Sequence, residues 1–203
     1  MPTDPNQLFA DAYEWLHGNL AGFLRFDGER LPMRVAPLSD GHLAAPVMVA
    51  MLTAADLVLE LPDDGDDDLH LMISLEPFDT RGEGGAWSDR WRAYHGQPED
   101  VNWARLMIDA VKFRGHYIDG TMLMRANPLA AEESALCRRV NAEFMANLAR
   151  YMAATTNRDA EAPVLVGVDP WGLDVRRRFE VVRVPAPSPW SDSAAVMATL
   201  QSA

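Results

Sequence analysis

The sequence predicts an α+β fold, in which a strand-rich part is followed by a smaller part that begins and ends with a helix. Three observations predict it. Short apolar runs alternate with turns containing Gly or Asp through the first part, as in antiparallel hairpins. Residues 127–152 then place apolar side chains at helical spacing. After them, the turn Asp169-Pro170-Trp171-Gly172 separates two apolar runs, and a short amphipathic segment follows.

The first element is expected to be a helix. Asp4 can cap it, and Pro5 suits the first helical position, because the N–H that proline lacks would have no partner there. One face carries the apolar residues Leu8, Ala12, Trp15 and Leu16. Gly18 marks the expected end of this helix.

Four apolar runs follow, at residues 31–38, 42–52, 57–61 and 69–75. We interpret them as strands of a sheet or barrel built from antiparallel hairpins. The acidic segment between the last two runs does not have the ligand spacing of an EF-hand, so we interpret it as a solvated turn. Residues 44–55 are rich in alanine and methionine, which leaves a helix open as an alternative there.

The next segment is expected to contain a polar loop and more strands. Residues 79–89 form the Gly-rich loop, which is a candidate lid. Residues 90–94 and 103–109 are predicted strands, and the alternation of the second continues through residues 111–116. A helix that starts at Pro98 is the competing interpretation, because Pro98-Glu99-Asp100 resembles a helix start.

The clearest predicted helix begins at Asn127-Pro128 and runs to about residue 152. Asparagine can cap a helix, proline fits the next position, and two glutamates follow in the first turns. Apolar residues then recur at four-residue steps: Leu136, Val140, Phe144, Leu148 and Met152. We expect residues 164–168 and 179–184 to form the two strands of the hairpin, and Ser191 to cap a last helix.

Composition excludes several classes of partner. The formal net charge is −12, and such a surface repels nucleic acid and anionic membrane faces. No apolar run approaches the ~20 residues of a membrane span, and the N-terminus does not resemble a signal peptide. The single cysteine, Cys137, excludes an intrachain disulfide and is expected to be a buried structural thiol. These features predict a cytoplasmic protein.

No complete catalytic signature is present, so catalytic residues stay unassigned. The sequence has no Gly-x-Gly-x-x-Gly motif, no Walker loop and no Gly-x-Ser-x-Gly elbow. The histidines form no His-x-x-x-His pair, and no Cys-x-x-Cys motif accompanies them, so no metal site is predicted. Three residues are candidates for cofactor binding. Arg34 can either face solvent or reach a phosphate from its strand. His95 and His116 lie near glycine in predicted sheet, and a lone histidine can ligate a heme iron.

Motifs in both parts carry a family resemblance. Asn141-Ala142-Glu143, residues 167–175 and Val182-Arg183-Val184-Pro185 are similar, in order and spacing, to the C-terminal domain of bacterial heme-utilisation proteins. Residues 32–35 are similar to the first barrel strand of the same family, and residues 113–117 to its glycine-rich strand near the barrel's end. From about residue 25 onward, the chain therefore resembles the split-barrel family of FMN-binding and pyridoxamine-phosphate-oxidase-like proteins.

The resemblance implies an antiparallel split β-barrel in residues 1–126, followed by a small helix–hairpin–helix domain in residues 127–203. It also implies a homodimer with FMN or heme at the barrel interface. Arg34 would contact the anionic group, and His95 or His116 would be the polar or axial ligand.

The chain also departs from the family pattern. Flavin-binding members grip the FMN phosphate with Thr or Ser and Lys or Arg, where this chain has the apolar residues 44–52. Phe144 stands where the family often has a histidine, and no histidine follows His116. Two hypotheses stay open. The chain is a cofactor-binding protein, or it is a non-enzymatic binding or regulatory module that has lost the cofactor site.

Overall fold

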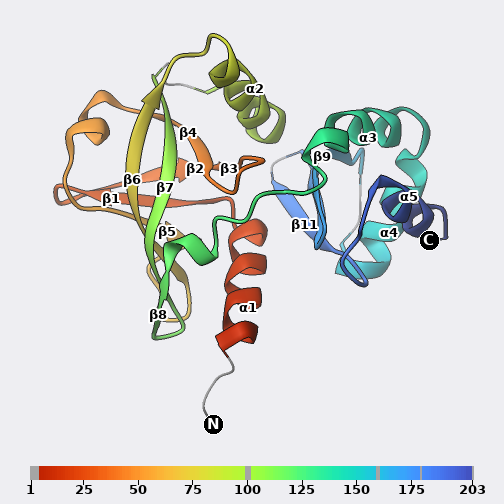
Figure 1. Cartoon of the computed structure of the whole chain (residues 1–203), viewed down its shortest axis with the longest axis horizontal. Helices are drawn as coiled ribbons and strands as arrows, with labels where there is room; N and C mark the ends of the chain where they lie inside the picture. Colours follow the sequence, from red (N-terminus) through yellow and green to blue (C-terminus); the bar gives the residue numbers. More distant parts are fainter. Residues whose placement is uncertain (1–4, 99–101, 159–160, 179, 203) are drawn as a thin grey trace. The chain divides into compact units, whose positions relative to one another are not determined.

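The structure is a computed structural model that describes residues 5–98, 102–158, 161–178 and 180–202. The chain divides into two compact units, Met1–Ala126 and Asn127–Ala203. Figure 1 shows a strongly curled sheet with two longer helices in the first unit, and a small sheet with its own helices in the second.

The first unit opens with helix α1, Pro5–Gly18, which confirms the predicted helix. Its buried side includes Leu8, Ala12 and Leu16, three of the four predicted apolar residues. Trp15 is only partly buried, and its indole Nε1 donates to the carbonyl oxygen of Leu61 at 2.9 Å. The predicted cap, Asp4, lies outside the described residues.

An antiparallel half-barrel forms the body of the first unit. Its strands follow the order β2-β1-β5-β6-β7-β4-β3, and β8 pairs with β7. Their bounds are β1 Ala21–Phe26, β2 Glu29–Arg34, β3 Ala36–Pro37, β4 Leu43–Val47, β5 Leu57–Leu61, β6 Leu69–Phe78, β7 Asn102–Phe113 and β8 His116–Asp119. The first strand lies in residues for which the sequence predicted no strand. Leucines dominate the concave side, where those of β5 and β6 at positions 59, 61, 69 and 71 are fully buried.

The two ends of this sheet meet at one residue. Among the strands that the structure describes, β2 pairs only with β1 and β3 pairs only with β4, yet the two strands are separated in sequence by Val35 alone. The backbone N–H of Val35 donates to the carbonyl oxygen of Leu20 at 2.9 Å. We call residues 34–37 the corner, because there the chain leaves one edge of the sheet and joins the other.

Helix α2, Glu83–His95, corrects two predictions, since residues 79–89 were expected to be a loop and residues 90–94 a strand. Its buried residues, Gly84, Ser88, Trp91 and Tyr94, follow one another at steps of three or four, which is helical spacing. Gly84 is part of this packing, because a Cβ there would lie 2.0 Å from the carbonyl oxygen of Asp79. The competing helix from Pro98 would begin over residues 99–101, which lie outside the described residues; beyond them its prediction is wrong, because residues 102–113 form β7.

The alanine- and methionine-rich segment is divided between two elements. Residues 43–47 form β4, and Val49–Thr53 form a short 3₁₀ helix, η1. A second 3₁₀ helix, η2, covers Gly120–Met122 and is capped by Asp119, whose side chain accepts from the backbone N–H of Thr121. In the described part of the chain, no helix has the length and apolar character needed to cross a membrane.

The second unit begins with two helices, α3 Ala130–Glu143 and α4 Met145–Thr156, where one long helix was predicted. The break falls at Phe144, with φ −125° and ψ 22°. Residues at four-residue steps drift by about 40° per step around a straight helix. Leu136 and Met152 would therefore face almost opposite directions, and the break lets both be buried.

A small antiparallel sheet follows, in the order β11-β10-β9. Strand β9, Val164–Asp169, turns at the predicted hairpin into β10, Gly172–Arg176. The sequence placed the returning strand at residues 179–184. That prediction is wrong, because β10 is the returning strand and β11, Val181–Pro185, is a third strand. Helix α5, Ser193–Ser202, comes last and is capped by Asp192, not by the predicted Ser191.

Candidate functional site

The corner is held in place by side chains of α2. Trp91 donates from its indole Nε1 to the carbonyl oxygen of Arg34 at 2.9 Å, and the Nε2 atom of His95 lies 2.8 Å from the carbonyl oxygen of Val35. These contacts connect residues 57 and 60 positions apart in the sequence. The backbone of Arg34 is therefore fixed, which limits where its side chain can reach.

Arg34 itself is exposed. Met33, the residue before it, is 5% exposed and points into the barrel, so Arg34 points outward by the alternation of a strand. Its guanidinium forms no hydrogen bond or ion pair with any residue that the structure describes. It is thus an outward-facing cation on a fixed backbone.

Apolar side chains surround Arg34 on the outer face of β1 and β2. Ala21 lies opposite Arg34 in the register, and Phe23 lies opposite Pro32. Ala21 and Pro32 are exposed and Phe23 is half-buried. The guanidinium of Arg30 covers the Phe23 ring at 3.7 Å from its centroid. We call Ala21, Phe23, Pro32 and Arg34 the β1–β2 surface.

His95 lies close to the corner but is already engaged. Because a carbonyl oxygen accepts hydrogen bonds, the contact with Val35 requires a proton on Nε2. The imidazole ring also packs against Trp91, with ring centroids 5.0 Å apart. Iron ligation through Nε2 would require this hydrogen bond to break, so the geometry fits a structural histidine better than an axial ligand.

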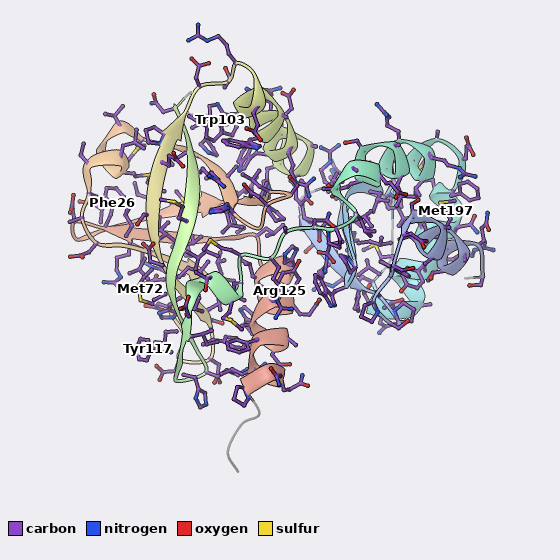
Figure 2. All side chains as sticks on the ribbon, viewed as in Figure 1. Phe26, Met72, Trp103, Tyr117, Arg125 and Met197 are labelled. Atoms are coloured by element: carbon purple, nitrogen blue, oxygen red, sulfur yellow. The ribbon has the colours of Figure 1, made fainter. Side chains whose placement is uncertain are left out.

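His116 lies elsewhere in the first unit. It is exposed and begins β8, after the tight turn at Arg114 and Gly115, both of which have positive φ. His116 pairs with Phe113 at one end of β7. Trp103 lies ten residues away along the same strand, and its ring centroid is 5.7 Å from that of Trp91 in α2. That corresponds to about 30 Å at ~3.3 Å per residue. Figure 2 shows the labelled Trp103 and Tyr117 at opposite ends of β7.

The structure therefore brings Arg34 and His95 to one corner and places His116 apart from both. Residues 44–52, where the resemblance would place the grip on an FMN phosphate, are apolar, as their sequence indicated. Ala44 and Ala45 are fully buried in β4, and Val49 of η1 is 63% exposed. No hydroxyl or cationic group in β4 or η1, apart from Thr53 at the end of η1, is available to hold a phosphate.

A second feature of the outer face lies across β5, β6 and β7. The register aligns Val58 with Met72 and Met72 with Ala110, and all three are only partly buried. Arg25 lies next to Val58 on β1, and Asp119 lies next to Ala110 on β8. We call Val58, Met72 and Ala110 the central apolar row; it is flanked at both ends by charged residues.

Glu60 borders this row and was not identified from the sequence. Its carboxylate is buried, 4% exposed, beneath two arginines that donate to it: Arg25 at 3.2 Å and Arg30 at 2.8 Å. Arg30 also pairs with Asp63. The alternation of β5 indicates that Glu60 points outward, but the side chains that cover it come from β1 and β2 and depend on register.

Another polar cluster lies at the opposite end of the outer face from His116. The guanidinium Nη2 of Arg105 on β7 lies 2.6 Å from Oδ2 of Asp40 and 3.0 Å from Nδ1 of His42. Its Nη1 lies 3.6 Å from Glu76, and its Cζ lies 5.5 Å from the Trp87 ring centroid. The buried Nε of Arg105 has no hydrogen-bond partner among the described residues. We call these five residues the Arg105 cluster.

Asp40 is strongly influenced by its neighbours in this cluster. Burial, the largest single effect, raises the pKa of its carboxyl. The backbone N–H of His42, the charge of His42 and the Arg105 guanidinium together outweigh burial, so the pKa lies below its usual value. Asp40 is therefore a stable anion through the neutral range.

The motif residues of the second unit have structural partners. Asn141 donates to the carbonyl oxygen of Leu165 at 2.9 Å and accepts from its N–H at 2.8 Å, so it pairs with β9 as a neighbouring strand would. Asp169 accepts from the backbone N–H groups of Trp171 and Gly172 and closes the hairpin. The family-like motifs here thus maintain the fold of this unit.

In the part of the chain that the structure describes, no three His, Cys, Asp or Glu side chains lie close enough together to hold a metal ion. Cys137 is partly buried and packs against the core of the second unit.

Comparison with known proteins establishes the fold alone. No protein-family model matches the sequence, and no curated protein matches it significantly. The chain is similar to the protein Atu2129 of Agrobacterium tumefaciens strain C58, of unknown function, at 17% identity and a TM-score of 0.77; the match covers 98% of this chain and 97% of that one. A heme binding protein from Mycobacterium smegmatis matches at 17% identity over 100% of this chain and 96% of that one, with a TM-score of 0.44.

Proposed function

We propose that this chain is a split-barrel protein that binds a planar, anionic ligand on its β1–β2 surface, with heme as the favoured candidate. The observation that carries the proposal is the outward-facing guanidinium of Arg34, which has no partner among the described residues and stands on a backbone fixed by Trp91. Arginine binds carboxylates and phosphates in a bidentate manner and holds its charge at every physiological pH.

The neighbours of Arg34 favour a ligand with an apolar plane. Ala21 and Pro32 are exposed, and the half-buried Phe23 beside them carries the Arg30 guanidinium over its ring. Heme combines a flat apolar ring with carboxylates at one edge, which suits apolar side chains beside one arginine. FMN instead carries a phosphate, and the apolar segment 44–52 provides no second group to grip it.

The histidines do not complete an iron site beside Arg34. His95 uses Nε2 to bind the corner, and His116 lies at the far end of β7. Binding should therefore depend on the carboxylate and the porphyrin plane, and not on a bond between iron and either histidine. No reaction is assigned to the bound state.

We also propose that two copies of the chain associate through the central apolar row. A row of partly buried apolar side chains with charged neighbours has the composition of an interface centre with a polar rim. The β1–β2 surface lies on the same outer face, two strands from Met72, so the ligand would bind near the boundary of the dimer.

The test of ligand binding is a titration with hemin and, in parallel, with metal-free protoporphyrin IX, followed by absorbance and fluorescence quenching. We expect similar affinity for both. Loss of one charge-assisted hydrogen bond costs about 1.5–3 kcal/mol, so Arg34→Ala should weaken both ligands roughly tenfold to a hundredfold. Arg138→Ala, at an exposed arginine of the second unit, is the matched control and should change neither.

Two outcomes would contradict this proposal. Hemin binding that persists unchanged in Arg34→Ala would exclude the anion contact. Binding of hemin alone, abolished by His116→Ala, would show an iron-ligated site at β8 instead.

The dimer has its own test. Sedimentation equilibrium should give twice the chain mass for the wild type and the monomer mass for Met72→Asp, since a charge in the apolar row opposes its burial. Met145→Asp changes a methionine that is 45% exposed in the second unit and should leave the dimer intact. A monomeric wild-type protein would exclude the proposed interface.

The second candidate function is a binding or regulatory module without a cofactor. The observation that favours it is the engagement of His95 with Val35, because a residue expected to serve a cofactor instead stabilises the corner. A colourless protein that takes up neither porphyrin nor FMN, and that is dimeric, would favour this function over the first.

A further inference from the structure

The Arg105 cluster contains one nitrogen that faces two partners of opposite kind. Nδ1 of His42 lies 3.0 Å from the Nη2 donor of Arg105 and 3.2 Å from the Oδ1 acceptor of Asp40. A ring nitrogen accepts a hydrogen bond when it carries no proton and donates one when it does. Nδ1 can therefore satisfy Arg105 or Asp40, but not both at once.

The protonation state of His42 decides between them. In the neutral ring, Nδ1 accepts from Arg105 and the proton sits on Nε2. In the charged ring both nitrogens carry protons, so Nδ1 donates to Asp40 and faces Arg105 as a like charge. The side chain of His42 is only 19% exposed and that of Arg105 only 23%, which limits the screening of this repulsion by water.

Arg105 has a second carboxylate within reach. Glu76 on β6 lies opposite Arg105 in the register, and its Oε2 is 3.6 Å from Nη1. Glu76 is 58% exposed and can follow a moving guanidinium. The charged groups that face His42 are thus Asp40 from its own turn, Arg105 from β7 and Glu76 next to Arg105.

We propose that His42 is a proton-operated switch that releases Arg105 from the β3–β4 turn toward Glu76. When the ring of His42 is neutral, Arg105 holds both Asp40 and His42. When it is charged, His42 and Asp40 pair with each other, and Arg105 shifts along the face of Trp87. Histidine side chains in general change their charge between about pH 5 and 8, which sets the pH range of the test.

The turn that carries the switch also contacts the end of the first unit. Gly41, between Asp40 and His42, has φ +90°, and a Cβ there would lie 2.4 Å from the backbone N of Arg125 and from the carbonyl carbon of Met124. The turn therefore packs directly on the backbone of residues 124–125, at the end of the first unit.

The experiment is a ¹⁹F spectrum of the full chain labelled with 5-fluorotryptophan, recorded from pH 5 to 8. The Trp87 resonance is assigned from the variant Trp87→Phe. We expect this resonance to shift with a single transition, because the Arg105 guanidinium lies over the Trp87 ring. The transition should vanish in His42→Gln and persist in His70→Gln, whose imidazole contacts Gly65 instead.

A Trp87 resonance that ignores pH, or that shifts equally in His42→Gln, would overturn the proposal. A second measurement does not depend on any variant. Long-range ¹H–¹⁵N correlation of the wild-type protein should show neutral His42 with its proton on Nε2. A proton on Nδ1 in the neutral ring would also overturn the proposal, since that tautomer cannot accept from Arg105.

Discussion

Arg183 is the residue whose replacement should most disturb the second unit. Its guanidinium donates from Nη2 to Asp169 at 2.7 Å and from Nη1 to Asp174 at 3.1 Å. The three side chains are 5%, 6% and 3% exposed, so the charges are almost fully removed from water. Arg183→Met keeps much of the side-chain volume but leaves two buried carboxylates without their shared cation.

Breaking a buried ion pair by removing one partner costs about 3–5 kcal/mol. A unit of this size has a total stability of about 4–12 kcal/mol at ~0.05–0.15 kcal/mol per residue, so the change removes a large share of it. Because 1.4 kcal/mol corresponds to a factor of ten, backbone amides of β9 to β11 should exchange with solvent roughly a hundredfold to a few thousandfold faster.

Hydrogen-exchange mass spectrometry of the full chain measures the exchange rates of the backbone amides in each unit separately. Arg150→Met removes an exposed arginine from α4 and should change exchange by less than tenfold. Adding Asp169→Asn and Asp174→Asn to Arg183→Met should recover part of the loss, because neutral side chains no longer require a cation. Less than a tenfold effect of Arg183→Met would refute the reasoning that the arginine offsets two buried charges.

Three further predictions concern single contacts. Gly41→Ala should lower the free energy of unfolding, measured by urea titration, by about 2–5 kcal/mol, whereas Gly28→Ala should lower it by about 1–2 kcal/mol. Both glycines have a positive φ, but of the two only Gly41 would place an added Cβ against backbone atoms. Asn141→Ala should cost about 1–3 kcal/mol by leaving the buried backbone groups of Leu165 unpaired, and faster exchange confined to β9 would be the sign. The backbone N–H of Ala195 and the Ser191 hydroxyl lower the pKa of the Asp192 carboxyl below its ordinary value of 3.8. The stabilisation of α5 by this cap is therefore complete above pH 3.8 and is lost as the pH falls through the lower pKa of the folded state. Circular dichroism should show this acid-induced loss of helix in the wild type and not in Asp192→Ala, and equal behaviour of the two would refute it.

Elements with local signals could be predicted from the sequence. Helix α1, strands β5 and β6 and the turn after Asp169 are each specified by nearby residues, such as a proline at a helix start or an Asp-Pro-x-Gly turn. Helix α2 could not be predicted in this way. Arg90 and Arg92 flank Trp91 in alternation, as in a strand, and the first turn of the helix contains Gly84 and Gly85, which resemble a loop.

The sites depend on contacts between distant residues, which one sequence does not reveal. Arg105 and Asp40 are 65 positions apart, and Glu60 lies 35 and 30 positions from the arginines that cover it. Arg34 was identified as a candidate because a cation is unusual in an apolar strand, but its fixed backbone requires Trp91, 57 positions away. Strand register decides such pairs, and register is a property of the folded sheet.

The corner at Val35 also determines how the sheet avoids unwanted partners. Unpaired strand edges can recruit strands of other chains and start aggregation. Two of the edge strands, β2 and β3, are six and two residues long and belong to one continuous segment. They carry Arg30, Pro32, Arg34 and Pro37, and both arginine charge and the missing N–H of proline oppose the addition of a strand. The segment that joins these two edges of the sheet therefore also opposes the addition of strands from other chains there.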